Sequence, residues 1–274
     1  MHNLLRSFAL VALIHATVLQ PALGQNKILT ETRPAGTFTR IVNTCSADIE
    51  LSQGDKNEIE VVADASIIGD LKTTISGKTL TIDMHNARPF RAIKKLKVRI
   101  TVSDLQEIVL NGSGDLITLN PLQSANLKLK INGSGDARII MKSGSLEASI
   151  NGSGDINVKG VRGSLHLDNH GSGDFTGQNL QLDDAVIACF GSGDTKLEGK
   201  AATLKIDVHG SGDVSTLEMP AEKVLIEVRG SGNIKTWATH SVKVGLYGSG
   251  DIHIEGNPKD RQVSKFGSGS IRFL

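Results

Sequence analysis

The stretch INGSGDARIIMKSGSLEASINGSGD, residues 131–155, decides the fold, because it holds two copies of Asn-Gly-Ser-Gly-Asp that lie nineteen residues apart. Gly-Ser-Gly recurs along the chain, with 18 to 21 residues from one copy to the next. The nine copies begin at Gly112, Gly133, Gly152, Gly171, Gly191, Gly210, Gly230, Gly248 and Gly267. A repeat of nearly constant length is typical of a solenoid, in which each repeat forms one coil of a stack.

The residues on both sides of each copy alternate between apolar and polar, which is the period of a β-strand. Leu204, Ile206 and Val208 lie before one copy, and Ile156 and Val158 lie after another. Each repeat is therefore expected to be two strands joined at a glycine corner. Such strands bury their apolar faces only by stacking, so we predict an all-β right-handed parallel β-helix (a solenoid) with about 19–20 residues per coil.

Glycine at the corners has two expected reasons: a positive φ angle, and stacked corners that leave no space for a Cβ atom. An aspartate follows seven of the nine copies. Its carboxylate is expected to bond backbone amides of its own turn. The alternative is that the aspartate column binds calcium. Apart from that alternative, no cofactor is expected.

The chain is expected to begin with two segments outside the β-helix. Residues 1–24 have the pattern of a signal peptide, with Arg6 ahead of an apolar run, and residues 25–36 are expected to be a flexible lead-in. The β-helix domain then covers residues 37–274. Export predicts a protein in the periplasm, on the cell surface or secreted.

The β-helix domain is expected to have two parts, irregular N-terminal coils over residues 37–100 and the Gly-Ser-Gly coils over 101–274. Residues 37–100 lack Gly-Ser-Gly but keep the alternation, and Gln53-Gly54-Asp55 is expected to be a degenerate corner. With 30 basic and 29 acidic residues the chain is nearly neutral, which argues against a nucleic-acid partner. No apolar run is long enough to predict a membrane-spanning helix.

The two cysteines are expected to be free and buried. Cys189 occupies an inward position that other repeats fill with aliphatic residues, and Cys45 lies in another alternating run. Several coils separate them, which is too far for a disulfide.

The Asn-Gly-Ser-Gly-Asp segments at 111–115, 132–136 and 151–155, set among short alternating strands, resemble the family called putative auto-transporter adhesin, head GIN domain. The resemblance covers about residues 37–274. It implies an exported bacterial β-helix with an adhesive or surface-binding role, and it implies no catalytic residues.

His166, Asp168 and His170 alternate along one strand, so all three should point outward on one face. Such a set could bind zinc. The alternative is the ordinary polar face of an exposed strand. We predict no metal site, and these three residues are the candidates if one exists.

The residue before each Gly-Ser-Gly forms a column whose chemistry changes along the chain. Its first three members are asparagines, and its last six are His170, Phe190, His209, Arg229, Tyr247 and Phe266. If these six point outward, they form an aromatic and basic stripe that suits sugar rings or protein surfaces. The alternative is that they stack on one another and stabilise the corners.

No catalytic signature is present, and the uniform repeats leave little room for the inserted loops that form a catalytic groove. We therefore expect a non-enzymatic adhesin or envelope-binding module whose partner is a glycan or protein of the cell surface or envelope. One alternative is a structural envelope protein that self-associates end to end through its C-terminal coil. A second alternative is a degenerate carbohydrate-active β-helix enzyme.

Overall fold

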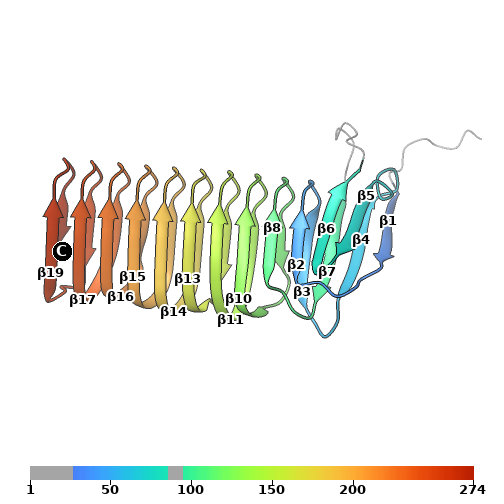
Figure 1. Cartoon of the computed structure of the whole chain (residues 1–274), viewed down its shortest axis with the longest axis horizontal. Coiled ribbons are helices and arrows are strands. Elements are labelled where there is room, and N and C mark those ends of the chain that lie inside the picture. The colour runs from blue at the N-terminus through green and yellow to red at the C-terminus, as the bar shows by residue number, and fades with distance from the viewer. Residues whose placement is uncertain (1–26, 86–94) are drawn as a thin grey trace, which may run out of the picture.

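The computed structural model describes residues 27–85 and 95–274, and the expected signal peptide lies outside them. These residues form strands stacked side by side in a single row, with the N-terminal strands at one end and the Gly-Ser-Gly corners along one edge (Figure 1). No helix in this part of the chain is long and apolar enough to cross a membrane. The stacked parallel strands confirm the predicted parallel β-helix.

Most of the chain belongs to the parallel stack, which we call the rod. Its strands are β2 (Arg40–Asn43), β3 (Asp48–Gln53), β8 (Glu107–Leu110), β9 (Leu116–Thr118), β10 (Leu122–Ile131), β11 (Ala137–Ile150), β12 (Ile156–Lys159), β13 (Arg162–Asn169), β14 (Phe175–Cys189), β15 (Thr195–Val208), β16 (Val214–Val228), β17 (Ile234–Leu246), β18 (Ile252–Glu255), β19 (Asp260–Lys265) and β20 (Ile271–Phe273). All their pairings with one another are parallel.

The long strands show that each coil has three segments whose side chains point into the core. Two strands per coil were expected from the sequence. Along β14 the side chains alternate between buried and outward, and this alternation breaks at residues 178–179 and again at 183–184, where two successive residues are exposed. Leu180 and Leu182 form the inward run between these two breaks. The breaks bend the strand around the core, and the first of them coincides with a shift in the register with β15, between Gly177 and Leu180.

The first coil does not follow the expected boundaries. Residues Thr44–Asp48 form its corner, between β2 and β3, and this corner stacks directly on Asn111–Asp115, since Asn111 N–H donates to Asn43 O (2.8 Å). The corner expected at Gln53-Gly54-Asp55 is wrong, because this segment connects β3 to the antiparallel strand β4.

Five strands cover the N-terminal end of the rod, and we call them the cap. They are β1 (Ile28–Arg33), β4 (Glu58–Asp64), β5 (Leu71–Ser76), β6 (Thr79–Met84) and β7 (Leu96–Val102). β6 and β7 continue the parallel stack onto β2 and β3, and β5, β4 and β1 add antiparallel strands. Residues 37–100 are therefore one regular coil plus a mixed cap, and the lead-in expected to be flexible contains the edge strand β1.

The structure shows why the corners carry glycine. None of them has a positive φ, so that expected reason is wrong. The second reason is confirmed: a Cβ atom built on Gly133 would lie 1.9 Å from Gly112 O, and one on Gly135 would lie 2.2 Å from Gly114 O. Backbone lies on backbone at every stacked corner, so glycine is required by contact between coils.

The core is a set of aliphatic columns with few polar members. Asn169 is one of them, and its amide donates to Gly173 O (2.8 Å) while its oxygen accepts from Gly171 N–H (3.0 Å). Both cysteines are free, as predicted, but only Cys189 is buried and Cys45 is partly exposed at the first corner. Burial raises the pKa of both thiols.

Candidate functional site

The column of residues before the corners runs along one edge of the rod, and its first members form an amide ladder. Asn132 Nδ2 donates to Asn111 Oδ1 (2.7 Å), and Asn151 Nδ2 donates to Asn132 Oδ1 (2.9 Å). These asparagines are exposed. The register that stacks the glycines thus also stacks the residues before them.

From His170 onward the same column is a ladder of rings and one guanidinium. His170 and Phe190 stack with centroids 4.5 Å apart and planes 4° from parallel, and Phe190 and His209 stack at 5.1 Å and 21°. Tyr247 and Phe266 stack at 5.5 Å and 7°. The side chains of the column therefore stack on one another and are also exposed, and their role in binding stays a prediction.

Arg229 joins the two ring stacks. Its Nη1 lies 3.0 Å from His209 Nε2, and its guanidinium carbon lies 5.8 Å from the centre of the Tyr247 ring. Glu227 pairs with Arg229 Nη2, and Asp207 Oδ1 lies 3.1 Å from His209 Nε2 and 3.6 Å from Arg229 Nη1. We call the six residues from His170 to Phe266 in this column the ring ladder.

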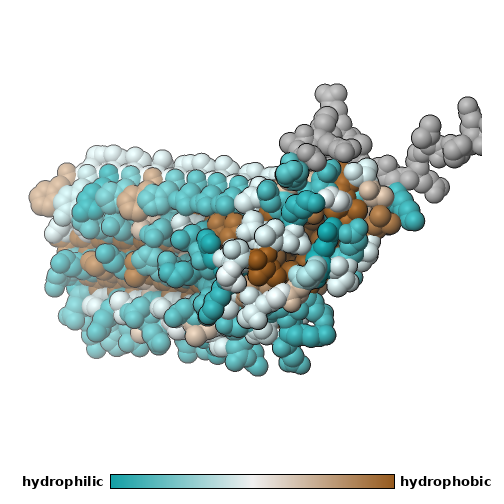
Figure 2. Space-filling model, turned by 45° about the vertical axis from the view of Figure 1, so that its right-hand side comes forward, coloured by the Kyte–Doolittle hydropathy of each residue, from teal (hydrophilic) through white to brown (hydrophobic). Residues whose placement is uncertain are grey.

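The ring ladder exposes large apolar side chains in a line. Phe190 is 44 % exposed, Tyr247 47 % and Phe266 77 %. Because neighbouring rings are nearly parallel, they cover much of one another's faces and leave their edges toward solvent. Figure 2 shows the molecule from one side, with a pale line along its upper edge and both hydrophilic rows and hydrophobic patches beneath it.

The aspartates after the corners form a second ladder that differs from the expected turn caps. Each Oδ1 accepts the backbone N–H of the equivalent residue in the next coil, as in Asp155 N to Asp136 Oδ1 (3.0 Å) and Asp174 N to Asp155 Oδ1 (2.8 Å). Asn233 accepts in the same way from Asp251 N (2.9 Å). These bonds fix one oxygen of each side chain. In the last of them, hydrogen bonds from Ser270 lower the pKa of Asp251.

The three candidate metal ligands do not converge. His166 Nε2 lies 3.2 Å from Asp168 Oδ2, whereas His170 stacks on Phe190. Among residues 27–85 and 95–274, no group of three His, Cys, Asp or Glu side chains is placed to hold a metal ion.

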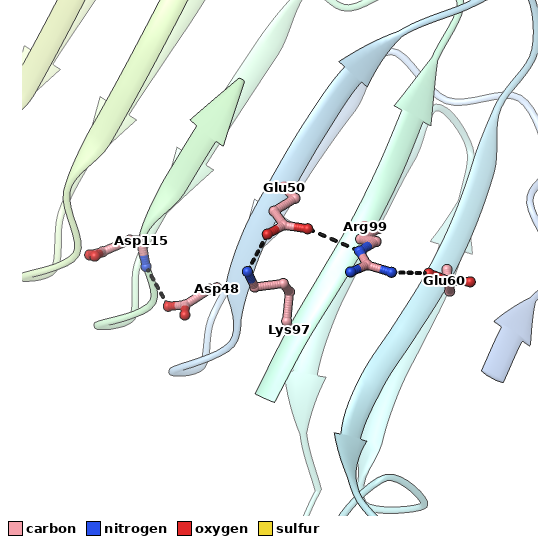
Figure 3. Close-up of polar contacts among 6 residues, drawn as sticks. All are labelled: Asp48, Glu50, Glu60, Lys97, Arg99 and Asp115. Atoms are coloured by element: carbon pink, nitrogen blue, oxygen red, sulfur yellow. Dashed lines mark hydrogen bonds and ion pairs between the residues drawn. The ribbon is translucent and has the colours of Figure 1, made fainter. Parts of the chain in front are cut away.

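The junction between cap and rod carries a charge network that the sequence did not reveal (Figure 3). Glu50 on β3 pairs with Lys97 and Arg99 on β7, and Arg99 Nη1 also lies 2.9 Å from Glu60 on β4. Hydrogen bonds from Lys97 and then Arg99 hold the pKa of Glu50 below its ordinary value. Only the pairing of β3, β7 and β4 brings these charges together, because they are up to 49 residues apart in sequence.

A family model described as "Putative auto-transporter adhesin, head GIN domain" matches residues 37–197 and 163–258 of the chain. The two matched ranges overlap and include the first coil and the coils that carry most of the ring ladder. The comparison with curated proteins gave no match.

Several solved bacterial structures share the fold. A putative adhesin from Parabacteroides distasonis matches at a TM-score of 0.71 and 19% identity, over 92% of this chain and 98% of that one. A putative adhesin from Parabacteroides merdae matches at 0.66 and 19%, with the same coverage. A putative lipid binding protein from Parabacteroides distasonis matches at 0.64 and 23%, again over 92% and 98%. At these identities the likeness establishes the fold.

Proposed function

Because the chain belongs to the family described as "Putative auto-transporter adhesin, head GIN domain", we propose that it is a non-enzymatic binding protein of the adhesin type. It acts outside the cytoplasm, in the periplasm or on the cell surface. Its partner is a glycan or protein of the cell surface or envelope, and the rod is a rigid support on which the binding residues are displayed.

The ring ladder is the observation that supports this proposal. Of the exposed large hydrophobic side chains, Phe190, Tyr247 and Phe266 lie in one column, with His and Arg between them. Aromatic residues and arginine are enriched at binding surfaces, and aromatic rings supply contact area with little loss of side-chain entropy. The rod fixes their spacing, so the surface is preorganised.

The first three Gly-Ser-Gly coils suggest how to test this role without unfolding the protein. Their column positions carry asparagines that form a ladder of hydrogen bonds. We therefore choose the triple variant Phe190→Asn, Tyr247→Asn, Phe266→Asn, which removes the exposed rings but keeps a residue type that this column already carries. Binding is measured to a panel of immobilised cell-surface glycans and envelope polymers.

The proposal expects the wild-type protein to bind at least one member of the panel, and the triple variant to lose about tenfold or more in affinity, since interface aromatics are often worth more than about 1 kcal/mol each. The matched control is Leu225→Asn, Trp237→Asn, which removes two exposed apolar side chains outside the column and should leave binding unchanged. Equal losses in both variants, or no binding by the wild type, would reject the ring ladder as the binding surface.

Self-association is a second candidate function, favoured by the exposure of β19. All six of its residues are exposed, among them Val263, and within the described part of the chain it pairs only with β17. An open strand edge with an apolar residue can pair with a second copy. Sedimentation velocity over a hundredfold range of concentration tests this: a constant monomer contradicts it, and growth to longer particles that Val263→Lys abolishes supports it.

A further inference from the structure

A shallow groove of about 430 Å³ lies on the face of the rod that follows the corners, away from the ring ladder. It crosses four coils and is lined by residues of β9, β11, β12 and β14. Ile117, Arg138, Asn157 and Thr176 stand in one row across these coils, because the parallel register pairs each with the next. Asn157 and Thr176 are short, so a hollow lies between longer neighbours.

The groove is positively charged. Arg138 and Lys159 line it at diagonal positions on neighbouring strands, and no carboxylate is among its lining residues. Arg138 has one acidic neighbour outside the lining, Asp136 Oδ2 at 3.4 Å from Nη2. Lys159 has no ion pair with any residue of the described part. The groove thus offers two cations, of which Arg138 is partly neutralised by Asp136.

The rest of the lining adds an unused amide and an apolar wall. Asn157 is partly buried, and its side chain makes no hydrogen bond within residues 27–85 and 95–274, so its donor and acceptor face the groove unused. Ile117 and Ile140 supply aliphatic surface, and Ile140 is 39 % exposed. A mixture of a few polar groups with apolar surface is typical of small-ligand and sugar sites.

The groove continues along the rod. Thr176 also lines a second hollow of about 270 Å³, which extends across the coils of Lys196 and Lys235. There three aspartates, Asp174, Asp194 and Asp213, are among the lining residues, and Lys196 pairs with Glu198 and Glu218, so the positive charge is confined to the first hollow. Together the two hollows cross seven coils, or roughly 29 Å at ~4.8 Å per coil. An open channel of this shape fits a linear polymer better than a compact ligand.

We propose that this groove binds a linear glycan that carries carboxylates, with Arg138 and Lys159 holding a uronate carboxylate and Asn157 a neighbouring hydroxyl. Guanidinium groups suit carboxylates because they offer paired donors in one plane. The aliphatic wall of Ile117 and Ile140 packs on the C–H face of a sugar ring. The inference rests on the proposed binding function and adds to it a ligand class and a second surface.

The test measures binding of polygalacturonate by isothermal titration at about 150 mM salt, where contacts between distant charges are screened. Neutral dextran and vesicles containing phosphatidylglycerol are the comparison probes. The variant Arg138→Gln, Lys159→Gln removes the two cations, and Ile140→Asp places a negative charge in the groove at an exposed position. The matched control is Lys205→Gln, Lys243→Gln, which removes two exposed cations from the other face.

We expect polygalacturonate to bind, dextran not to bind, and both groove variants to weaken binding about tenfold or more, since a charge-assisted hydrogen bond contributes roughly 1.5–3 kcal/mol. The control should match the wild type. Equal weakening by the control, binding to the vesicles alone, or no binding to polygalacturonate would each overturn the inference. The ring-ladder triple variant separates the two proposals: if it alone loses polygalacturonate, the groove is rejected and the ring ladder stands.

Discussion

Two corners of the molecule have the same path but different residues, and the difference shows what glycine does in this fold. The first corner is Thr44-Cys45-Ser46-Ala47-Asp48, and the next is Asn111-Gly112-Ser113-Gly114-Asp115. A Cβ atom built on Gly112 would lie 2.0 Å from Cys45 O, and one on Gly114 would lie 2.0 Å from Ala47 O. No Gly-Ser-Gly corner precedes the first one, and it carries Cβ atoms at both positions. A corner therefore needs glycine where the backbone of the preceding corner leaves no space for a Cβ atom.

The largest expected effect follows from this comparison. Gly133→Ala should destabilise the protein by about 3 kcal/mol or more, because the new Cβ would lie 1.9 Å from backbone that cannot move without shifting a whole coil. The reverse change at the first corner, Ala47→Gly, should cost less than about 1 kcal/mol. Chemical denaturation followed by circular dichroism measures both. Similar losses of stability in the two variants would contradict the conclusion that contact with the preceding corner requires glycine.

The buried asparagines show a second difference between the first corner and the later ones. Asn43 and Asn169 both cap a corner from the core, with Asn43 Nδ2 donating to Ala47 O (2.8 Å). At the first corner, Cys45 N–H donates to Asn43 Oδ1 (3.2 Å). At the corner of Asn169, Gly171 N–H donates both to Asn169 Oδ1 and to Ile150 O of the preceding coil (3.1 Å). The preceding coil therefore supplies a second acceptor for the backbone N–H that Asn169 bonds.

We expect Asn43→Val to cost about 2 kcal/mol, because it leaves a backbone donor without a partner. Asn169→Val should be close to neutral, since the coils on either side already carry Ile150 and Cys189 in this column. The measurement is the midpoint of thermal unfolding for each variant. A larger loss for Asn169→Val would show that the backbone bond between coils does not compensate.

The charge network predicts a smaller, pH-dependent difference between cap and rod. Glu50 is 15% exposed and paired with two cations, whereas Glu147 on the rod is 49% exposed and pairs with Lys128. In both, hydrogen bonding to lysine lowers the carboxyl pKa below its ordinary value of 4.5. Each pair therefore stabilises the fold above that value, and this stabilisation is lost as the pH falls through the lowered pKa.

Glu50→Gln should cost about 1 kcal/mol at pH 7 and Glu147→Gln at most a few tenths, because exposed ion pairs contribute little. Stability measured from pH 7 to pH 3 should fall less steeply in Glu50→Gln than in the wild type. Parallel curves for the two proteins would contradict the assigned role of Glu50.

The smallest expected effect concerns the aspartate ladder. Asp155→Asn should change stability by less than about 0.5 kcal/mol, because an amide oxygen can still accept from Asp174 N–H, as Asn233 does in its coil. Asp155→Ala, which removes the acceptor, should cost about 1 kcal/mol. Unfolding is measured with and without millimolar calcium. A large calcium-dependent rise in the wild-type melting temperature would show that the aspartates bind cations.

The sequence was informative wherever a residue's role is set by its own repeat. Leu204, Ile206 and Val208 show their inward positions by alternation, and the period predicts the stack. Contacts between coils were harder to predict. The aspartate bonds its neighbour's amide rather than its own turn, and the corner glycines lack positive φ, because both depend on the coil next to them.

The cap could not be predicted from the sequence repeat, for a different reason. Thr44–Asp48 stacks on Asn111–Asp115 across 67 residues, and the intervening chain forms strands β4 to β7 with antiparallel pairings that no period marks. The positions of the six column residues follow from the repeat, because it fixes where each member stands, and their role in binding stays a prediction. The groove at Arg138 and Lys159 was not predicted, since a hollow depends on the sizes of side chains from four coils.

Under the proposed function, the corners and core hold the rod while the ring ladder binds the partner. The most direct measurement is stability and binding together on Phe190→Asn, Tyr247→Asn, Phe266→Asn. We expect unfolding free energy to fall by no more than about 2 kcal/mol, from lost ring stacking, while binding to the glycan and envelope panel is lost. Unchanged binding with a large loss of stability would contradict the claim and show that the ladder only holds the coils together.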